Sequence, residues 1–139
     1  MSSKLNSYVA KTRISVVKGD FLFAQVSSMK INSFFFRKIQ PFACIYEGSS
    51  YTVVAPVKSY MFLKTLGSKT SKPYSLICFD VELPLELAGY FAKFSSVLAK
   101  NKISMMPFSS YFHDYVLVKK KDSKKAVSCL KSFIKSYRG

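Results

Sequence analysis

The chain has 139 residues, which is enough for one compact domain or for two very small ones. Hydrophobic residues make up 49% of it, a share that excludes global disorder, and no apolar run approaches the roughly 20 residues that span a bilayer. The formal net charge of +15 is spread over both halves and predicts attraction to nucleic acids, anionic membranes or anionic metabolites, although a solvated basic surface is the favoured explanation.

Neither end of the chain nor its thiols point to secretion. The first residues contain no long apolar stretch and no small-residue cleavage pattern, so we expect a cytoplasmic location. Cys44, Cys78 and Cys129 lie far apart and are odd in number. This pattern predicts buried free thiols in a reducing compartment, without a metal or redox role.

The first half of the chain is predicted to be mostly strand. Residues 13–18 and 21–26 form two strands around the turn pair Gly19-Asp20, and residues 31–39 form a short helix. Residues 42–46 and 51–57 are rich in β-branched and aromatic residues around a Glu-Gly-Ser turn, which predicts a hairpin.

After a polar, turn-rich stretch at residues 67–73, the signals become sharper. We expect a strand at residues 74–81, a helix, strands at 103–108 and 111–119, and a last helix capped by Asp122 or Ser123. The apolar stripes of the two helices have spacings of four, three and four residues. They consist of Leu87, Phe91, Phe94 and Leu98, and of Ala126, Leu130, Phe133 and Tyr137.

This order of elements predicts an α+β fold with an antiparallel sheet and helices on one face. The second half has the strand–helix–strand–strand–helix order of a ferredoxin-like unit that lacks its last strand, and the first half is expected to supply that strand. We therefore divide the chain into residues 1–70, an eroded unit of mostly strands, and residues 71–139, a better-formed unit.

Four motifs in the second half carry a family resemblance. They are Leu87-Ala88-Gly89, the segment 98–104 (LAKNKIS), Ser109-Ser110, and the segment 114–119 (DYVLVK). In this order they resemble the ACT-like family of short tandem-ACT proteins, which includes a eukaryotic cytosolic arginine sensor. The resemblance implies two ACT-like βαββ units, amino-acid binding, regulation of a partner and a homodimer.

The resemblance also suggests a ligand site at the start of the first helix of the second half. The free backbone N–H groups of a helix N-terminus suit a carboxylate, and Asp114 suits the amino group of an amino acid. Gly89 allows close approach of a ligand, although it equally relieves crowding between helix and sheet. The expected site consists of backbone groups from Leu85, Glu86, Leu87 and Gly89, the carboxylate of Asp114 with help from Glu86, and walls from Phe108, Ser109, Ser110 and Tyr111.

Catalysis has little support in the sequence. The one histidine, His113, adjoins Asp114, but neighbouring residues of a strand point to opposite faces. No nucleotide-binding, nucleophile-elbow or metalloprotease motif is present, and the seven acids are too scattered for a metal site, so we expect no enzyme, no cofactor and no metal.

Two other classes stay open. Aromatic residues on a ferredoxin-like sheet stack on RNA bases, and residues 18–23 (KGDFLF) faintly resemble such an RNA-binding strand, although buried phenylalanines explain the pattern better. A scaffold subunit that adds its sheet edge to a partner is the third class.

Overall fold

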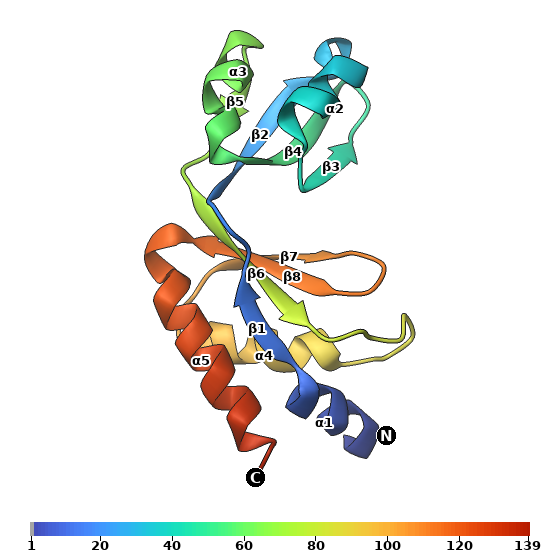
Figure 1. Ribbon diagram of the computed structural model, residues 1–139, viewed down its shortest axis with the longest axis vertical. Coiled ribbons are helices and arrows are strands. Elements are labelled where there is room, and N and C mark those ends of the chain that lie inside the picture. Colours follow the sequence, from blue (N-terminus) through green and yellow to red (C-terminus); the bar gives the residue numbers. More distant parts are fainter. Residues whose placement is uncertain (1) are drawn as a thin grey trace. The chain divides into compact units, whose positions relative to one another are not determined.

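The computed structural model describes residues 2–139 and forms two compact units (Figure 1). The terminal unit combines the chain up to Lys18 with Ser75–Gly139, and the central unit is Gly19–Tyr74. The division therefore differs from the predicted one, because the first 18 residues join the C-terminal part of the chain. The physical reason is strand pairing, since Arg13 lies opposite Asp80 and Val16 opposite Ile77.

The terminal unit has a ferredoxin-like sheet in the order β7–β8–β6–β1. Its elements are α1 (Ser2–Lys11), β1 (Arg13–Val16), β6 (Tyr74–Asp80), α4 (Tyr90–Lys100), β7 (Met105–Ser109), β8 (Asp114–Lys119), η3 (Lys120–Asp122) and α5 (Ser123–Ser136). The α+β class and the order after residue 73 are as predicted, and β1 provides the fourth strand that the second half lacks. Central β6 and β8 bury residues on both faces, as their continuous apolar runs indicate.

One aromatic and aliphatic core holds α4 and α5 to this sheet. Phe79 of β6 packs against Phe94 of α4 with ring centroids 4.8 Å apart, and Phe94 also contacts Phe133 of α5 at 5.6 Å. The predicted stripe of α4 holds except at Leu87, which precedes the helix. In α5 the fully buried positions are Ala126, Leu130 and Ile134, while Phe133 and Tyr137 are half-buried.

Helix α1 was not predicted, and it packs against the start of α4. Leu5 and Val9 bury one side of it in the core of the terminal unit. Thr12, at its end, is fully buried and donates its hydroxyl proton to the carbonyl of Tyr8 at 2.7 Å. The Tyr90 hydroxyl lies 2.6 Å from Thr12 Oγ1 and must therefore be the donor of that second bond.

The central unit is a second ferredoxin-like arrangement, with strand order β3–β4–β2–β5. Its elements are β2 (Phe21–Ser27), η1 (Ser28–Lys30), α2 (Ser33–Ile39), β3 (Ala43–Tyr46), β4 (Ser50–Pro56), η2 (Val57–Ser59), α3 (Tyr60–Thr65) and β5 (Lys69–Thr70). The predicted strands, hairpin and first helix are present, and α3 adds helix that the sequence did not indicate. Asn32 caps α2 by accepting from the Phe35 amide at 2.9 Å.

The three cysteines are free, but the prediction that they are buried was wrong for Cys44, which is exposed on β3. Cys78 and Cys129 are partly buried. Burial and the nearby Asp80 raise the pKa of the Cys78 thiol, so this thiol stays protonated. Across residues 2–139, none of the helices has the length and apolar character needed to cross a membrane.

The hydrogen bond between Thr12 and Tyr90 gives a stability test. Thr12→Val leaves the buried Tyr90 hydroxyl without its acceptor, and we expect the free energy of unfolding to fall by about 1–3 kcal/mol in urea titrations. Thr12→Val combined with Tyr90→Phe removes both polar groups and should recover part of this loss. Additive losses in the double variant would show that the bond is not what stabilises this contact.

Candidate functional site

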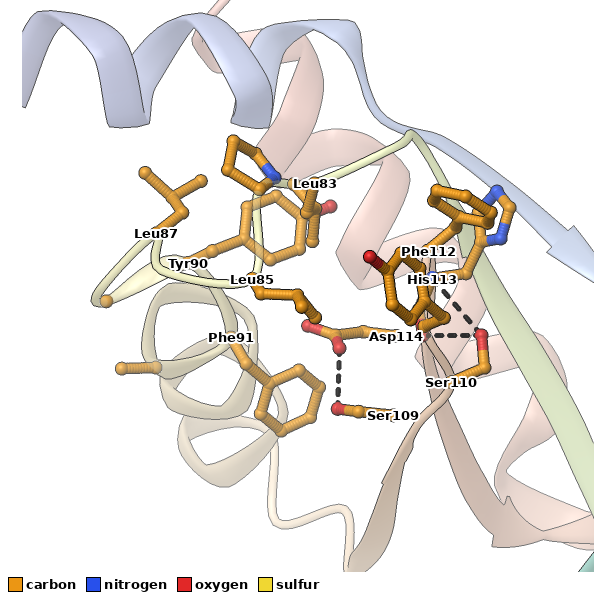
Figure 2. A pocket seen from close by; sticks show the side chains of 14 residues that line it. Leu83, Leu85, Leu87, Tyr90, Phe91, Ser109, Ser110, Phe112, His113 and Asp114 are labelled. Atoms are coloured by element: carbon orange, nitrogen blue, oxygen red, sulfur yellow. Dashed lines mark hydrogen bonds between the residues drawn. The ribbon is translucent and has the colours of Figure 1, made fainter.

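A pocket lies in the terminal unit between the start of α4 and the tip of the β7–β8 hairpin (Figure 2). Its volume is about 310 Å³, at the lower end of the range for small-molecule sites. The amide of Leu83 donates to the carbonyl of Phe112 at 3.3 Å and joins the two walls. All of its lining residues belong to the terminal unit.

Most of the residues predicted from the sequence meet at this pocket. Those that line it are Leu85, Leu87, Gly89, Ser109, Ser110, Tyr111 and Asp114. Glu86 and Phe108 are not among its lining residues. Phe108 precedes Ser109 on β7, and strand alternation turns its side chain to the other face, while Glu86 is exposed in the turn before α4.

The sequence analysis missed the other lining residues, which are Leu83, Pro84, Tyr90, Phe91, Ala92, Phe112 and His113. The apolar stripe predicts that Phe91 faces the core. In the structure Phe91 is half-buried and also lines the pocket. For the residues at the start of α4, the helical periodicity of the sequence could have indicated their place at the pocket. The first turn of a helix presents residues around its whole circumference at its end, so an open N-terminus exposes several consecutive positions.

The start of α4 is open to the pocket. Gly89 occupies the N-cap position with φ of 84°, and no side chain caps the helix there. Gly89 and the next three residues all line the pocket. A Cβ on Gly89 would lie 3.4 Å from Leu5 Cδ2, an ordinary contact, so the left-handed φ, rather than crowding, is what favours glycine here.

The opposite wall is the tip of the β7–β8 hairpin. The Ser110 amide donates to the His113 carbonyl at 2.9 Å and closes the turn. Ser109 Oγ donates to Asp114 Oδ1 at 2.7 Å and fixes the carboxylate, which Figure 2 shows pointing into the pocket between Leu85 and Ser109. A carboxylate accepts about four hydrogen bonds, so Asp114 keeps acceptor capacity for a ligand.

The charged groups near the pocket form two sets, Asp114 in its wall and the contacts of Asp80 beside it. Beside it, His113 Nε2 lies 3.6 Å from Asp80 Oδ1, and Arg13 Nη2 lies 3.3 Å from Asp80 Oδ2. Burial raises the pKa of Tyr90 far above its usual range, and the negative charge of Asp114 raises it further, against the bond to Thr12. The Tyr90 phenol is therefore uncharged where it lines the pocket. The charge of Asp114 acts on this residue at the start of α4.

The pocket offers hydrogen-bonding groups from both walls. His113 lies against Asp80, so it does not assemble with Asp114 and Ser109 into a Ser-His-Asp arrangement. Among the residues that the structure describes, no three of His, Cys, Asp or Glu gather as they would around a metal ion.

Comparisons with known proteins identify the class. Residues 70–132 match the family model of the ACT domain. The family resemblance expected from the sequence is thereby confirmed for the second half of the chain. No protein with curated function matches the chain by sequence.

Solved structures extend the likeness to both halves. A Vibrio cholerae protein of unknown function is similar over 95% of this chain and 97% of its own, with 25% identity and a TM-score of 0.78. The regulatory subunit of Thermus thermophilus aspartate kinase covers 88% of this chain and 97% of its own, with 12% identity and a TM-score of 0.64. Clostridium acetobutylicum aspartate kinase, an allosteric enzyme, is similar over 87% of this chain and 34% of its own, with 16% identity and a TM-score of 0.65.

The alternative of RNA binding gains no support from these comparisons. The weak motif at residues 18–23 places Phe21 in a buried position of the central unit and Phe23 edge-to-face with Tyr74 at 5.5 Å. Both rings contact other side chains, in agreement with the explanation that these phenylalanines are packing residues. Nucleic-acid binding stays a prediction that rests on the charge of the chain.

The raised pKa of Tyr90 predicts a specific loss of stability in alkali. The unfolded phenol ionises near its ordinary pKa of 10.0, whereas the folded one does not, so protons are lost first from the unfolded state. Between about pH 10 and pH 11 the free energy of unfolding should fall by about 1 kcal/mol more in the natural protein than in Tyr90→Phe. Denaturant titrations along this pH range measure the difference, and parallel curves for the two proteins would contradict the buried, neutral phenol.

Proposed function

We propose that this protein is a regulatory module that binds an amino acid in the pocket at the start of α4. The observation that carries the proposal is the pairing of two complementary walls, an uncapped helix N-terminus and the carboxylate of Asp114. A free amino acid carries one negative and one positive group on a single carbon, so it matches two such walls at once.

The helix wall suits the carboxylate of the ligand. The first amides of an α-helix lack partners within the helix, and the helix dipole adds partial positive charge. The capping position is glycine, so no side chain competes for these amides. Backbone groups of Leu85 and Leu87, in the preceding turn, extend this wall in the proposal.

The hairpin wall suits the ammonium group. Asp114 is held by Ser109, and Ser110 adds a second hydroxyl at the rim. The apolar side chains of Leu83, Phe91 and Tyr111 lie between the walls and would surround the side chain of the ligand. Glu86 stays outside this arrangement, so the proposal assigns it no contact.

The comparisons support regulation as the purpose of binding. The regulatory subunit of one aspartate kinase shares the fold, and so does part of a second aspartate kinase that is described as an allosteric enzyme. A ligand regulates a partner when it binds one arrangement of the protein better than another. Resemblance to the tandem-ACT proteins adds a homodimer and a cytoplasmic location to the proposal.

Asp114→Asn tests the site. We expect thermal unfolding of the natural protein, measured with each proteinogenic amino acid in turn, to shift upward with one ligand or one chemical group of ligands. A ligand at about 100 times its Kd adds about 2.7 kcal/mol, which is several degrees for a domain of this size. Asp114→Asn should lower the affinity for that ligand by about tenfold or more, because a charged hydrogen bond is lost.

Glu86→Gln is the matched control. It removes the same charge from the neighbouring turn but does not line the pocket, so the ligand should bind it as it binds the natural protein. Equal weakening in both variants would mean that the ligand responds to net charge rather than to the pocket. If no amino acid shifts the unfolding temperature, the proposed ligand class is wrong.

A further inference from the structure

A second hollow of the terminal unit, separate from the pocket, runs between β1 and α5. Its volume is about 670 Å³, roughly twice that of the pocket, and it is lined chiefly by cations. Arg13 comes from β1, and Lys131, Lys135 and Arg138 come from α5 and the residues after it. The aliphatic side chains of Ile14 and Ile134 contribute its apolar part. We call this hollow the basic groove.

The positive charge of the basic groove is only partly balanced. None of the described residues that line it carries a carboxylate, and the sequences of α1, β1 and α5 contain neither Asp nor Glu. Asp80 reaches Arg13 at 3.3 Å, but the Arg13 side chain is still 78% exposed. Cations that line one hollow repel one another, so an anionic occupant would stabilise the groove.

One of the cations is fixed in place. Arg138 donates from Nε to the carbonyl of Ala10 at 2.8 Å and from Nη2 to the carbonyl of Thr12 at 3.0 Å. A guanidinium has five N–H donors, so donors remain for an anion after these two bonds. Arg138 thus ties the end of α1 to the end of α5 and presents a charge whose position is set in advance.

The shape of the groove favours an extended peptide. In the terminal unit β1 is the edge strand of the sheet. Val17 donates to the Leu76 carbonyl at 2.8 Å, and alternation along the pairing directs the backbone groups of Ile14 and Val16 away from β6, where an added strand would bind. Lys131 and Lys135 are one helical turn apart, about 6 Å along the axis. Alternate residues of an extended chain repeat at a similar interval, about 6.8 Å.

We propose that the basic groove binds an extended acidic segment of a partner protein, with Asp or Glu at every second position, alongside β1. Acidic side chains on one face of that segment meet the cations of α5, and its backbone pairs with the open edge. Single-stranded nucleic acid fits less well, because binding without sequence preference relies on aromatic side chains for stacking and none of the described lining residues is aromatic.

The experiment uses the full chain and a short fluorescent peptide that alternates Glu and Val, with fluorescence anisotropy as the readout. We expect Lys131→Gln combined with Lys135→Gln to weaken binding by about tenfold or more. The matched control is Lys124→Gln combined with Lys125→Gln, which removes the same charge from the same helix outside the groove. This control should change affinity much less, and amide signals of Ile14 and Val16 should shift when the peptide binds.

Three outcomes would overturn the proposal. Equal weakening in the two double variants would show a general electrostatic attraction. Equal affinity for a peptide of the same composition with its Glu residues in one block would remove the role of the strand edge. Tighter binding of a single-stranded RNA of equal charge, lost on changing Lys131 and Lys135, would assign the groove to nucleic acid instead.

Discussion

Pairing between β1 and β6 is the contact on which the terminal unit depends. It joins residues 67 positions apart, as in the bond from Arg13 to Asp80, and it completes a sheet that the C-terminal segment lacks on its own. Such non-local pairing requires closure of a long loop before it contributes any stability. Because the intervening chain forms the central unit, that loop has a core of its own.

Local patterns of apolar residues predicted most strands and helices, because alternation and the i, i+3, i+4 spacing reflect which positions are buried. They did not foretell α1, whose core contribution is limited to Leu5 and Val9, nor α3, which has only 6 residues. Short helices depend on tertiary packing rather than on propensity, so their sequences carry a weak signal. The assignment of the first 18 residues failed for a related reason, because strand partners are a property of the whole fold.

Most residues of the predicted site lie around one pocket, because a helix start and a hairpin tip are recognisable from sequence. The details that failed concern direction. Phe108 belonged to the right strand but alternation turned it away, and Leu87 lay in the right segment although the left-handed φ of Gly89 starts the helix later. The family resemblance predicted the ACT fold, whereas the chemistry of the pocket depends on the position of Asp114 opposite an uncapped helix start.

The pocket and the basic groove share a structural element. Thr12 lines the groove, and its hydroxyl accepts from Tyr90, which lines the pocket. Coupling between two binding sites requires an element whose arrangement both ligands influence, and this hydrogen bond joins a residue of each lining. Arg138 holds the carbonyl of the same Thr12, so the residue is bonded on both sides. In the proposed regulatory role, a ligand in the pocket would influence the groove through this junction of α1 and β1.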